Sequence, residues 1–138
     1  YEISLGLVGS EMCIRDRALE KLEGVSVNYP LLESSPYHEL AEKQLSGKGG
    51  AILTIRAGSK ERAYKLINHL KYVKIATNIG DVRTLVIHPA STIYIHSTPE
   101  AMEEAGVYDD TIRISVGIED IKDLIQDFTE AVESLGEE

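Results

Sequence analysis

The chain contains 138 residues, of which 23 are acidic and 14 are basic, so that its formal net charge is −9. Nucleic acid and anionic membrane surfaces are therefore poor partners, because both repel an acidic chain. The sequence also contains no apolar run long enough to span a bilayer.

Residues 1–17 (YEISLGLVGSEMCIRDR) have no pattern typical of a helix or a strand. Residues 7–16 back-translate onto the tag and mosaic end of a transposase-type sequencing adaptor. We therefore interpret residues 1–17 as an adaptor-derived artefact, expect them to be disordered, and exclude them from the fold. The alternative is a short apolar strand or a clipped signal sequence, which the charged residues of this segment fit poorly.

The remaining 121 residues, 18–138, contain 20 acidic and 12 basic residues, and their net charge is −8. The only cysteine, Cys13, lies in the excluded segment, which rules out disulfide frameworks and thiolate metal sites in the rest of the chain. This composition is compatible with a cytoplasmic protein of metabolism. The length predicts one domain with a single core.

Apolar periodicity and turn residues predict alternating helices and strands. In chain order they are the end of a helix over 18–23, a strand over 25–29, a helix over 37–45, a strand over 51–56, a helix that runs from Ser59 to Leu70, a short strand or extended link over 72–76, a strand over 82–87, a short helix from Thr98 to Gly106, a strand over 111–116, and a last helix with apolar residues over 118–135.

Several residues predict where these elements begin and end. Ser59 is a good helix cap, and Pro99 fits the first turn of a helix. Gly24 and Gly106 are expected to end helices, and Pro89 is expected to end a strand.

Two helices carry apolar stripes. A short stripe on the helix over 37–45 comprises Leu40, Ala41 and Leu45. The long stripe of the last helix comprises Ile118, Ile121, Leu124, Ile125, Phe128, Val132 and Leu135. The alternation of strands and helices, without a Gly-rich phosphate loop, predicts an α/β fold: a small open, largely antiparallel sheet with helices on one face.

The strand over 111–116 alternates strictly. Its apolar face is Ile112, Ile114 and Val116, and its polar face is Thr111, Arg113 and Ser115. An arginine on a stiff strand between two short hydroxyl residues suits bidentate binding of a carboxylate or a phosphate. The alternative is a surface arginine that pairs with Glu119 or Asp120.

Two segments in order, NIGDVRTLVIHPAST (78–92) and IRISVGIEDIKDLI (112–125), resemble the C-terminal domain of the Cys/Met-metabolism family of pyridoxal-phosphate enzymes. Within that family they are most similar to the O-acetylhomoserine sulfhydrylase branch. The similarity extends back through VNYP (27–30) and covers nearly all of the chain from about Ala18 onward. It covers only the last part of such an enzyme.

The resemblance implies three substrate-binding residues, Arg113, Asn78 and Ser91. Arg113 occupies the position that binds the α-carboxylate of the substrate. Asn78 stands where many relatives have a serine near that carboxylate; the alternative is a turn asparagine bonded to its own backbone. Ser91 could line the entrance of the site or only close a turn. Ile93 and Tyr94 stand where many relatives have Thr-His. The acyl group of the substrate, and the branch of the family, therefore stay open.

The sequence assigns no catalytic, cofactor-binding or metal-binding residue to this part of the chain. His88, before a proline at the end of a strand, is expected to be structural. The other histidines, His38, His69 and His96, have no ligand spacing. Lys71 and Lys74 are expected at the surface, and Tyr29 in the core.

The resemblance further implies a cytoplasmic homotetramer that converts O-acetyl-L-homoserine and sulfide into homocysteine and acetate. The larger domain of such an enzyme holds pyridoxal 5'-phosphate as a Schiff base on a lysine. We therefore expect this chain alone to be inactive. The alternatives are a cystathionine γ-synthase or methionine γ-lyase of the same family, or a stand-alone regulatory module that binds an amino acid.

Overall fold

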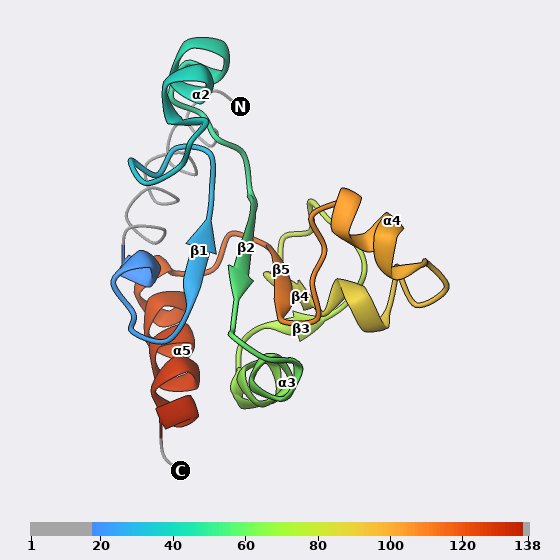
Figure 1. Ribbon diagram of the computed structural model, residues 1–138. Helices are drawn as coiled ribbons and strands as arrows, with labels where there is room; N and C mark the ends of the chain where they lie inside the picture. Colours follow the sequence, from blue (N-terminus) through green and yellow to red (C-terminus); the bar gives the residue numbers. More distant parts are fainter. Residues whose placement is uncertain (1–17, 137–138) are drawn as a thin grey trace.

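The structure is a computed structural model, and it describes residues 18–136 (Figure 1). The interpretation of residues 1–17 as adaptor-derived therefore lies outside the described residues. The elements after the first helical turn are β1 (Ser26–Asn28), α2 (His38–Leu45), β2 (Ile52–Arg56), α3 (Lys60–His69), β3 (Lys74–Ile75), β4 (Leu85–Ile87), a 3-10 turn (Pro89–Ser91), α4 (Pro99–Glu104), β5 (Thr111–Ser115), α5 (Ile121–Glu133) and a second 3-10 turn (Ser134–Gly136).

The strands form one five-stranded sheet in the order β1-β2-β5-β4-β3. Three of its pairings are antiparallel, and only β3 and β4 run parallel. The predicted fold class, an open and largely antiparallel sheet in an α/β domain, is therefore confirmed.

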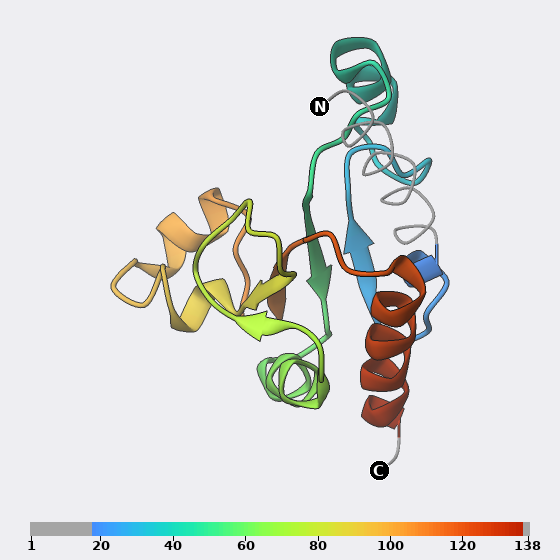
Figure 2. The same ribbon diagram turned by 180° about the vertical axis from the view of Figure 1, so that it is seen from behind.

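One face of the sheet forms the core together with the helices (Figures 1 and 2). Ile55, Ile112 and Ile114 are fully buried on this face. They share a cluster with Leu66 of α3 and Phe128 of α5. Helices on one face, as predicted, follow from the stripes that α3 and α5 present to it.

The helix ends predicted at Ser59, Thr98 and Gly106 are confirmed, whereas the first helix ends before Gly24. The Ser59 hydroxyl accepts a hydrogen bond from Arg62 N at 3.2 Å, which starts α3. The Thr98 hydroxyl accepts one from Ala101 N at 3.3 Å, which starts α4. Gly106 follows α4 with a φ of 68°, a left-handed conformation that glycine adopts without steric strain.

The buried stripe predicted for α2 is wrong. Leu40 and Leu45 are 50% and 42% exposed, and only Ala41 is buried. Figure 1 shows the reason: α2 lies at the end of the molecule farthest from α3 and α5, and neither of these two helices packs against it.

Three predicted boundaries differ by three residues, at the end of the first helix, the start of β4 and the start of α5. The first helix ends at Glu20, earlier than predicted, in a series of turns. Arg83 lies outside β4, because its N–H donates to the Asp81 carboxylate at 2.9 Å and forms a turn. Ile118 is 72% exposed and precedes α5, which begins only after Asp120.

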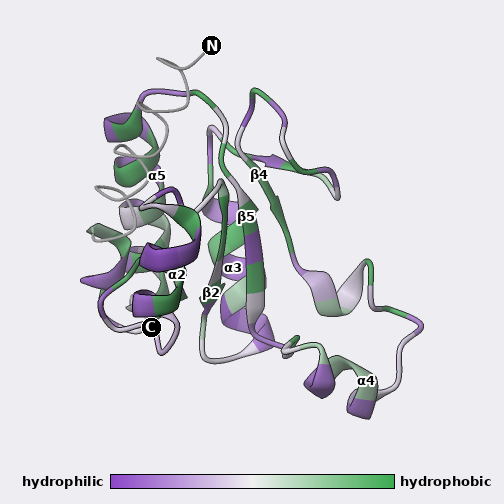
Figure 3. Cartoon of the chain, turned by 90° about the horizontal axis from the view of Figure 1, so that it is seen from above, coloured by the Kyte–Doolittle hydropathy of each residue, from purple (hydrophilic) through white to green (hydrophobic). Residues whose placement is uncertain are grey.

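The opposite face of the sheet is less open than its polar residues suggest. Thr111 and Ser115 are 4% and 1% exposed, although they belong to the polar face of β5. Leu85 and Ile87 of the hydrophobic strand β4 (Figure 3), which pair with Ser115 and Arg113 on this face, are also buried. The chain before β4 lies against this face, where Gly80 N donates to the Ser115 hydroxyl. The alternation of residues within one strand does not reveal such a contact.

Candidate functional site

Arg113 lies on the sheet face that the helices leave uncovered. Its direct neighbours are Thr54 on β2 and Ile87 on β4, and paired residues share a face. Because β5 is hydrogen-bonded to strands on both sides, the backbone of Arg113 has a fixed position.

The guanidinium of Arg113 is directed toward the chain between β3 and β4. Its Nη2 donates to the carbonyl oxygens of Thr77 and Asn78, at 2.7 and 3.4 Å. Its Nε is buried without a hydrogen-bond partner among the described residues. The side chain thus keeps at least one unused donor next to Asn78.

The alternative that pairs Arg113 with a neighbouring carboxylate is not supported. Glu119 accepts hydrogen bonds from Thr84 instead, and Asp120 accepts one from Lys122 N at the start of α5. Within residues 18–136, no carboxylate lies in ion-pair distance of Arg113.

Asn78 belongs to a loop of residues 77–83, which we call the 77–83 loop. The Asn78 side chain is exposed and makes no hydrogen bond to the described residues, so it is not a turn asparagine bonded to its own backbone. In the same loop, Gly80 N donates to the buried Ser115 hydroxyl at 3.1 Å.

The end of this loop is fastened to the chain after β5 by a carboxylate. Thr84 N and Thr84 Oγ1 donate to the two oxygens of Glu119, at 2.6 and 2.8 Å. Gly117 N donates to Thr84 Oγ1 at 3.0 Å. A side chain at Gly117 would place its Cβ 2.3 Å from Val82 O. Neither Thr84 nor Glu119 can be assigned this role from the sequence, because a contact between distant segments leaves no periodic signal.

Ser91 is not part of the Arg113–Asn78 pair, and no hydrogen bond connects it to either residue. Its hydroxyl lies 2.8 Å from His88 Nδ1, and His88 Nε2 lies 2.6 Å from Asp109 O. His88 is 4% exposed and packs edge-on against Tyr64, with ring centroids 4.9 Å apart. These contacts hold the His88 ring between Ser91, Asp109 and Tyr64. Of the three predicted site residues, the structure brings together only Arg113 and Asn78.

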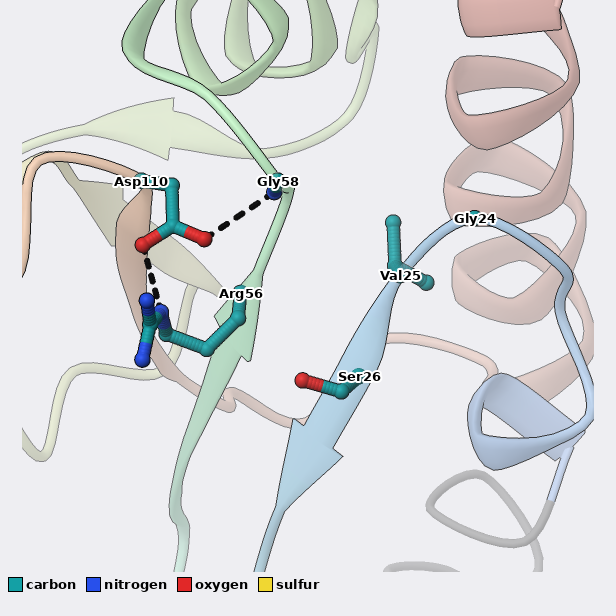
Figure 4. Close-up of a pocket in the computed structure, with 6 residues that line it drawn as sticks. All are labelled: Gly24, Val25, Ser26, Arg56, Gly58 and Asp110. Atoms are coloured by element: carbon teal, nitrogen blue, oxygen red, sulfur yellow. Dashed lines mark hydrogen bonds and ion pairs between the residues drawn. The ribbon is translucent and has the colours of Figure 1, made fainter.

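A second arginine on the same sheet face, Arg56, already has a carboxylate partner. Arg56 pairs with Asp110, and its guanidinium carbon lies 3.9 Å from the centroid of the Tyr108 ring. Asp110 also accepts a hydrogen bond from Gly58 N at 3.0 Å. Figure 4 shows the depression that these groups line beside Ser26. Asp110 balances the charge of Arg56, so this arginine is less available to bind an anionic ligand than Arg113. The depression is therefore the weaker candidate site.

The described part of the chain offers no sheltered amine and no metal centre. Every lysine between residues 18 and 136 is exposed, as expected for Lys71 and Lys74. Lys71 Nζ lies 2.5 Å from a carboxylate oxygen of Glu130. This hydrogen bond raises the pKa of Lys71 and lowers the pKa of Glu130. No group of three or more metal-ligand residues occurs within residues 18–136, and no helix there is long and apolar enough to cross a membrane.

The sequence of residues 18–133 matches the model of a protein family described as Cys/Met metabolism PLP-dependent enzyme. The chain is 43% identical over 115 residues to O-acetyl-L-homoserine sulfhydrylase 1 of Thermus thermophilus. It is 45% identical over 117 residues to homocysteine synthase of Schizosaccharomyces pombe. Each match covers 83% of this chain and 27% of the relative. Other relatives are described as L-methionine gamma-lyases and O-succinylhomoserine sulfhydrylases.

The fold matches a solved structure from Campylobacter jejuni, described as an O-acetylhomoserine (thiol)-lyase that carries a pyridoxyl-lysine phosphate group. The TM-score is 0.84 at 32% sequence identity, and the match covers 94% of this chain and 31% of the other. The chain thus spans less than a third of the length of the proteins that it matches.

Proposed function

We propose, from the premise that the chain belongs to the Cys/Met metabolism PLP-dependent enzyme family, that it holds the carboxylate of an amino-acid substrate. The observation that carries the proposal is the Arg113 guanidinium. It stands on a fixed strand beside Asn78, with a buried Nε that has no partner and with no carboxylate to neutralise it among residues 18–136.

The geometry around Arg113 suits this role. Backbone carbonyls of the 77–83 loop hold Nη2, which orients the planar group without cancelling its charge. A charge-assisted hydrogen bond from such a group contributes about 1.5–3 kcal/mol. Asn78 contacts the guanidinium through its backbone carbonyl, and its exposed side-chain amide is the second donor in this proposal. The described chain would therefore orient the substrate.

Pyridoxal 5'-phosphate, the cofactor of the family, does not fit the described residues. The Schiff base requires a sheltered lysine, and every lysine in residues 18–136 is exposed. We propose that the cofactor binds to the part of the enzyme that this chain does not cover, as the length of the relatives allows. When bound there, it supplies the electron sink of the reaction.

For the parent enzyme we propose an O-acetylhomoserine sulfhydrylase, which makes homocysteine and acetate from O-acetyl-L-homoserine and sulfide. The identity to sulfhydrylase and homocysteine synthase relatives supports this choice. A γ-lyase acting on L-methionine is the second candidate, because relatives so described match at 39% identity. Both candidate enzymes must bind the carboxylate of an amino-acid substrate, so the role proposed for Arg113 does not depend on the choice between them.

The experiment compares Arg113→Ala and Arg113→Lys with Arg83→Ala in the longer protein that carries this chain. Arg83 is an exposed arginine close to the site, whose side chain makes no hydrogen bond to the described residues. We expect Arg113→Ala to lower kcat/KM for O-acetyl-L-homoserine at least about 100-fold, equivalent to about 2.7 kcal/mol. Arg113→Lys should restore little, because lysine cannot bind in a bidentate manner.

An Arg113→Ala enzyme as active as the Arg83→Ala control would refute the carboxylate role. A calorimetric titration of the 138-residue chain with O-acetyl-L-homoserine separates the remaining alternative. Tight and selective binding by the chain alone would favour a stand-alone module over part of an enzyme.

A further inference from the structure

The 77–83 loop is held by hydrogen bonds and not by burial. Every side chain from residue 77 to residue 83 is exposed, so the hydrophobic effect contributes little to its position. Its bonds to other elements go to a single segment, which starts with Arg113. Besides the contacts of Arg113 and Ser115, Ile118 N donates to Val82 O at 2.9 Å.

Ser115 is the buried side chain among these contacts, at 1% exposure. Its hydroxyl accepts the hydrogen bond from Gly80 N at 3.1 Å. Gly80 has a φ of 73°, which glycine adopts without steric strain. Gly80 also follows Asn78 by only two residues, so this bond acts close to the proposed substrate donor.

The spacing of the two partners matches along both segments. Arg113 and Ser115 lie on one face of β5, about 6.8 Å apart along the strand. Arg113 contacts the carbonyls of Thr77 and Asn78, and Ser115 contacts Gly80. The loop therefore runs beside the strand in one register, in which the Ser115 hydroxyl holds the part of the loop that directly follows Asn78.

We propose that Ser115 is a positioning residue. Through Gly80 it holds the carbonyls of Thr77 and Asn78 against the Arg113 guanidinium, and so it sets the direction of the donors that remain free. The effect on a substrate rests on the proposed function, whereas the effect on the loop does not.

The test is an NMR comparison of the 138-residue chain with Ser115→Ala and Ser134→Ala. Ser134 is a matched control, because it is 8% exposed and its hydroxyl donates to Ala131 O within the C-terminal turn. In Ser115→Ala we expect amide exchange of Gly80 to rise at least about tenfold and the Arg113 Nε–H signal to shift. Ser134→Ala should change neither signal, even if it lowers the melting temperature.

Ser115→Cys leaves no cavity, because its side chain is slightly larger, and its sulfur is a weaker acceptor. It should therefore give an intermediate change, and it guards against a cavity effect in the alanine variant. Unchanged Gly80 exchange and an unchanged Arg113 signal in both Ser115 variants would overturn the inference.

The effect on substrate binding is tested in the proposed parent enzyme that carries this chain. There Ser115→Ala should raise KM for O-acetyl-L-homoserine several-fold more than it lowers kcat, since the Arg113 side chain itself remains. Suppose that the NMR changes occur but activity is insensitive to both Ser115→Ala and Arg113→Ala. The proposed function is then wrong, while the positioning role of Ser115 is supported.

Discussion

The Glu119 carboxylate binds both the backbone N–H and the hydroxyl of Thr84, at 2.6 and 2.8 Å. Thr84 is fully buried, and the two residues are 35 positions apart. This contact joins the end of the 77–83 loop to the chain that leaves β5, so it contributes to the stability of the whole candidate site.

We expect Glu119→Gln to lower the free energy of unfolding of the 138-residue chain by about 1–3 kcal/mol, because the amide can accept only at its one carbonyl oxygen. Glu133→Gln is the control, since Glu133 is exposed on α5. Urea denaturation measures both variants. Equal midpoints for Glu119→Gln and Glu133→Gln would contradict the structural role of this carboxylate.

Gly117→Ala should also destabilise the chain. The added Cβ would lie 2.3 Å from Val82 O and 2.5 Å from Arg83 C, and moving backbone atoms to relieve such a contact costs about 1–3 kcal/mol. Gly136→Ala has no atom within 4 Å of its Cβ and should change stability by less than about 0.5 kcal/mol. A thermal melt that ranks the two variants equally would show that the loop does not approach Gly117 as described.

Asp127 of α5 is expected to tolerate little change. It is 2% exposed, and its carboxylate accepts hydrogen bonds from Lys71 N at 3.0 and 3.1 Å and from Tyr72 N at 3.0 Å. Asp127→Ala would remove the hydrogen bonds from two N–H groups to a charged acceptor, each of which contributes about 1.5–3 kcal/mol. Asp123→Ala, at an exposed position of the same helix, should be nearly neutral in the same urea titration.

The Lys71–Glu130 pair should give a small stabilisation that depends on pH. The hydrogen bond to Lys71 lowers the pKa of Glu130 below its ordinary 4.5, so this contribution is present above that value and is lost as the pH falls through the lowered pKa. The hydrogen bond to Glu130 raises the pKa of Lys71 above 10.5. The contribution of Lys71 is therefore present below 10.5 and is lost as the pH rises through the raised pKa.

Both side chains of this pair are partly exposed, 61% for Lys71 and 37% for Glu130, so the effect is weak and screened by salt. We expect the melting temperatures of Glu130→Gln and the unchanged chain to differ slightly at neutral pH. They should converge in acid and in 1 M salt. A difference that persists in acid would assign the effect to packing of Glu130 and not to its charge.

The sequence by itself determined what depends on near neighbours in the chain. The caps at Ser59 and Thr98 are formed by residues within three positions of one another, and the apolar face of β5 follows from alternation alone. These features need no distant partner, since helix capping and strand pleating are properties of short segments. The family resemblance also rested on sequence alone, and the match of residues 18–133 to the family model confirms it.

Only the tertiary structure decided how the two faces of the sheet are used. The exposure of Leu40 depended on whether another helix lay beside α2, and the burial of Ser115 depended on the loop that returns over β5. It likewise decided that Arg113 faces Asn78, whereas Ser91 is bonded to His88. Such contacts join positions that are distant in the chain, and their free energy depends on which surfaces meet, a property that no local pattern of residues encodes.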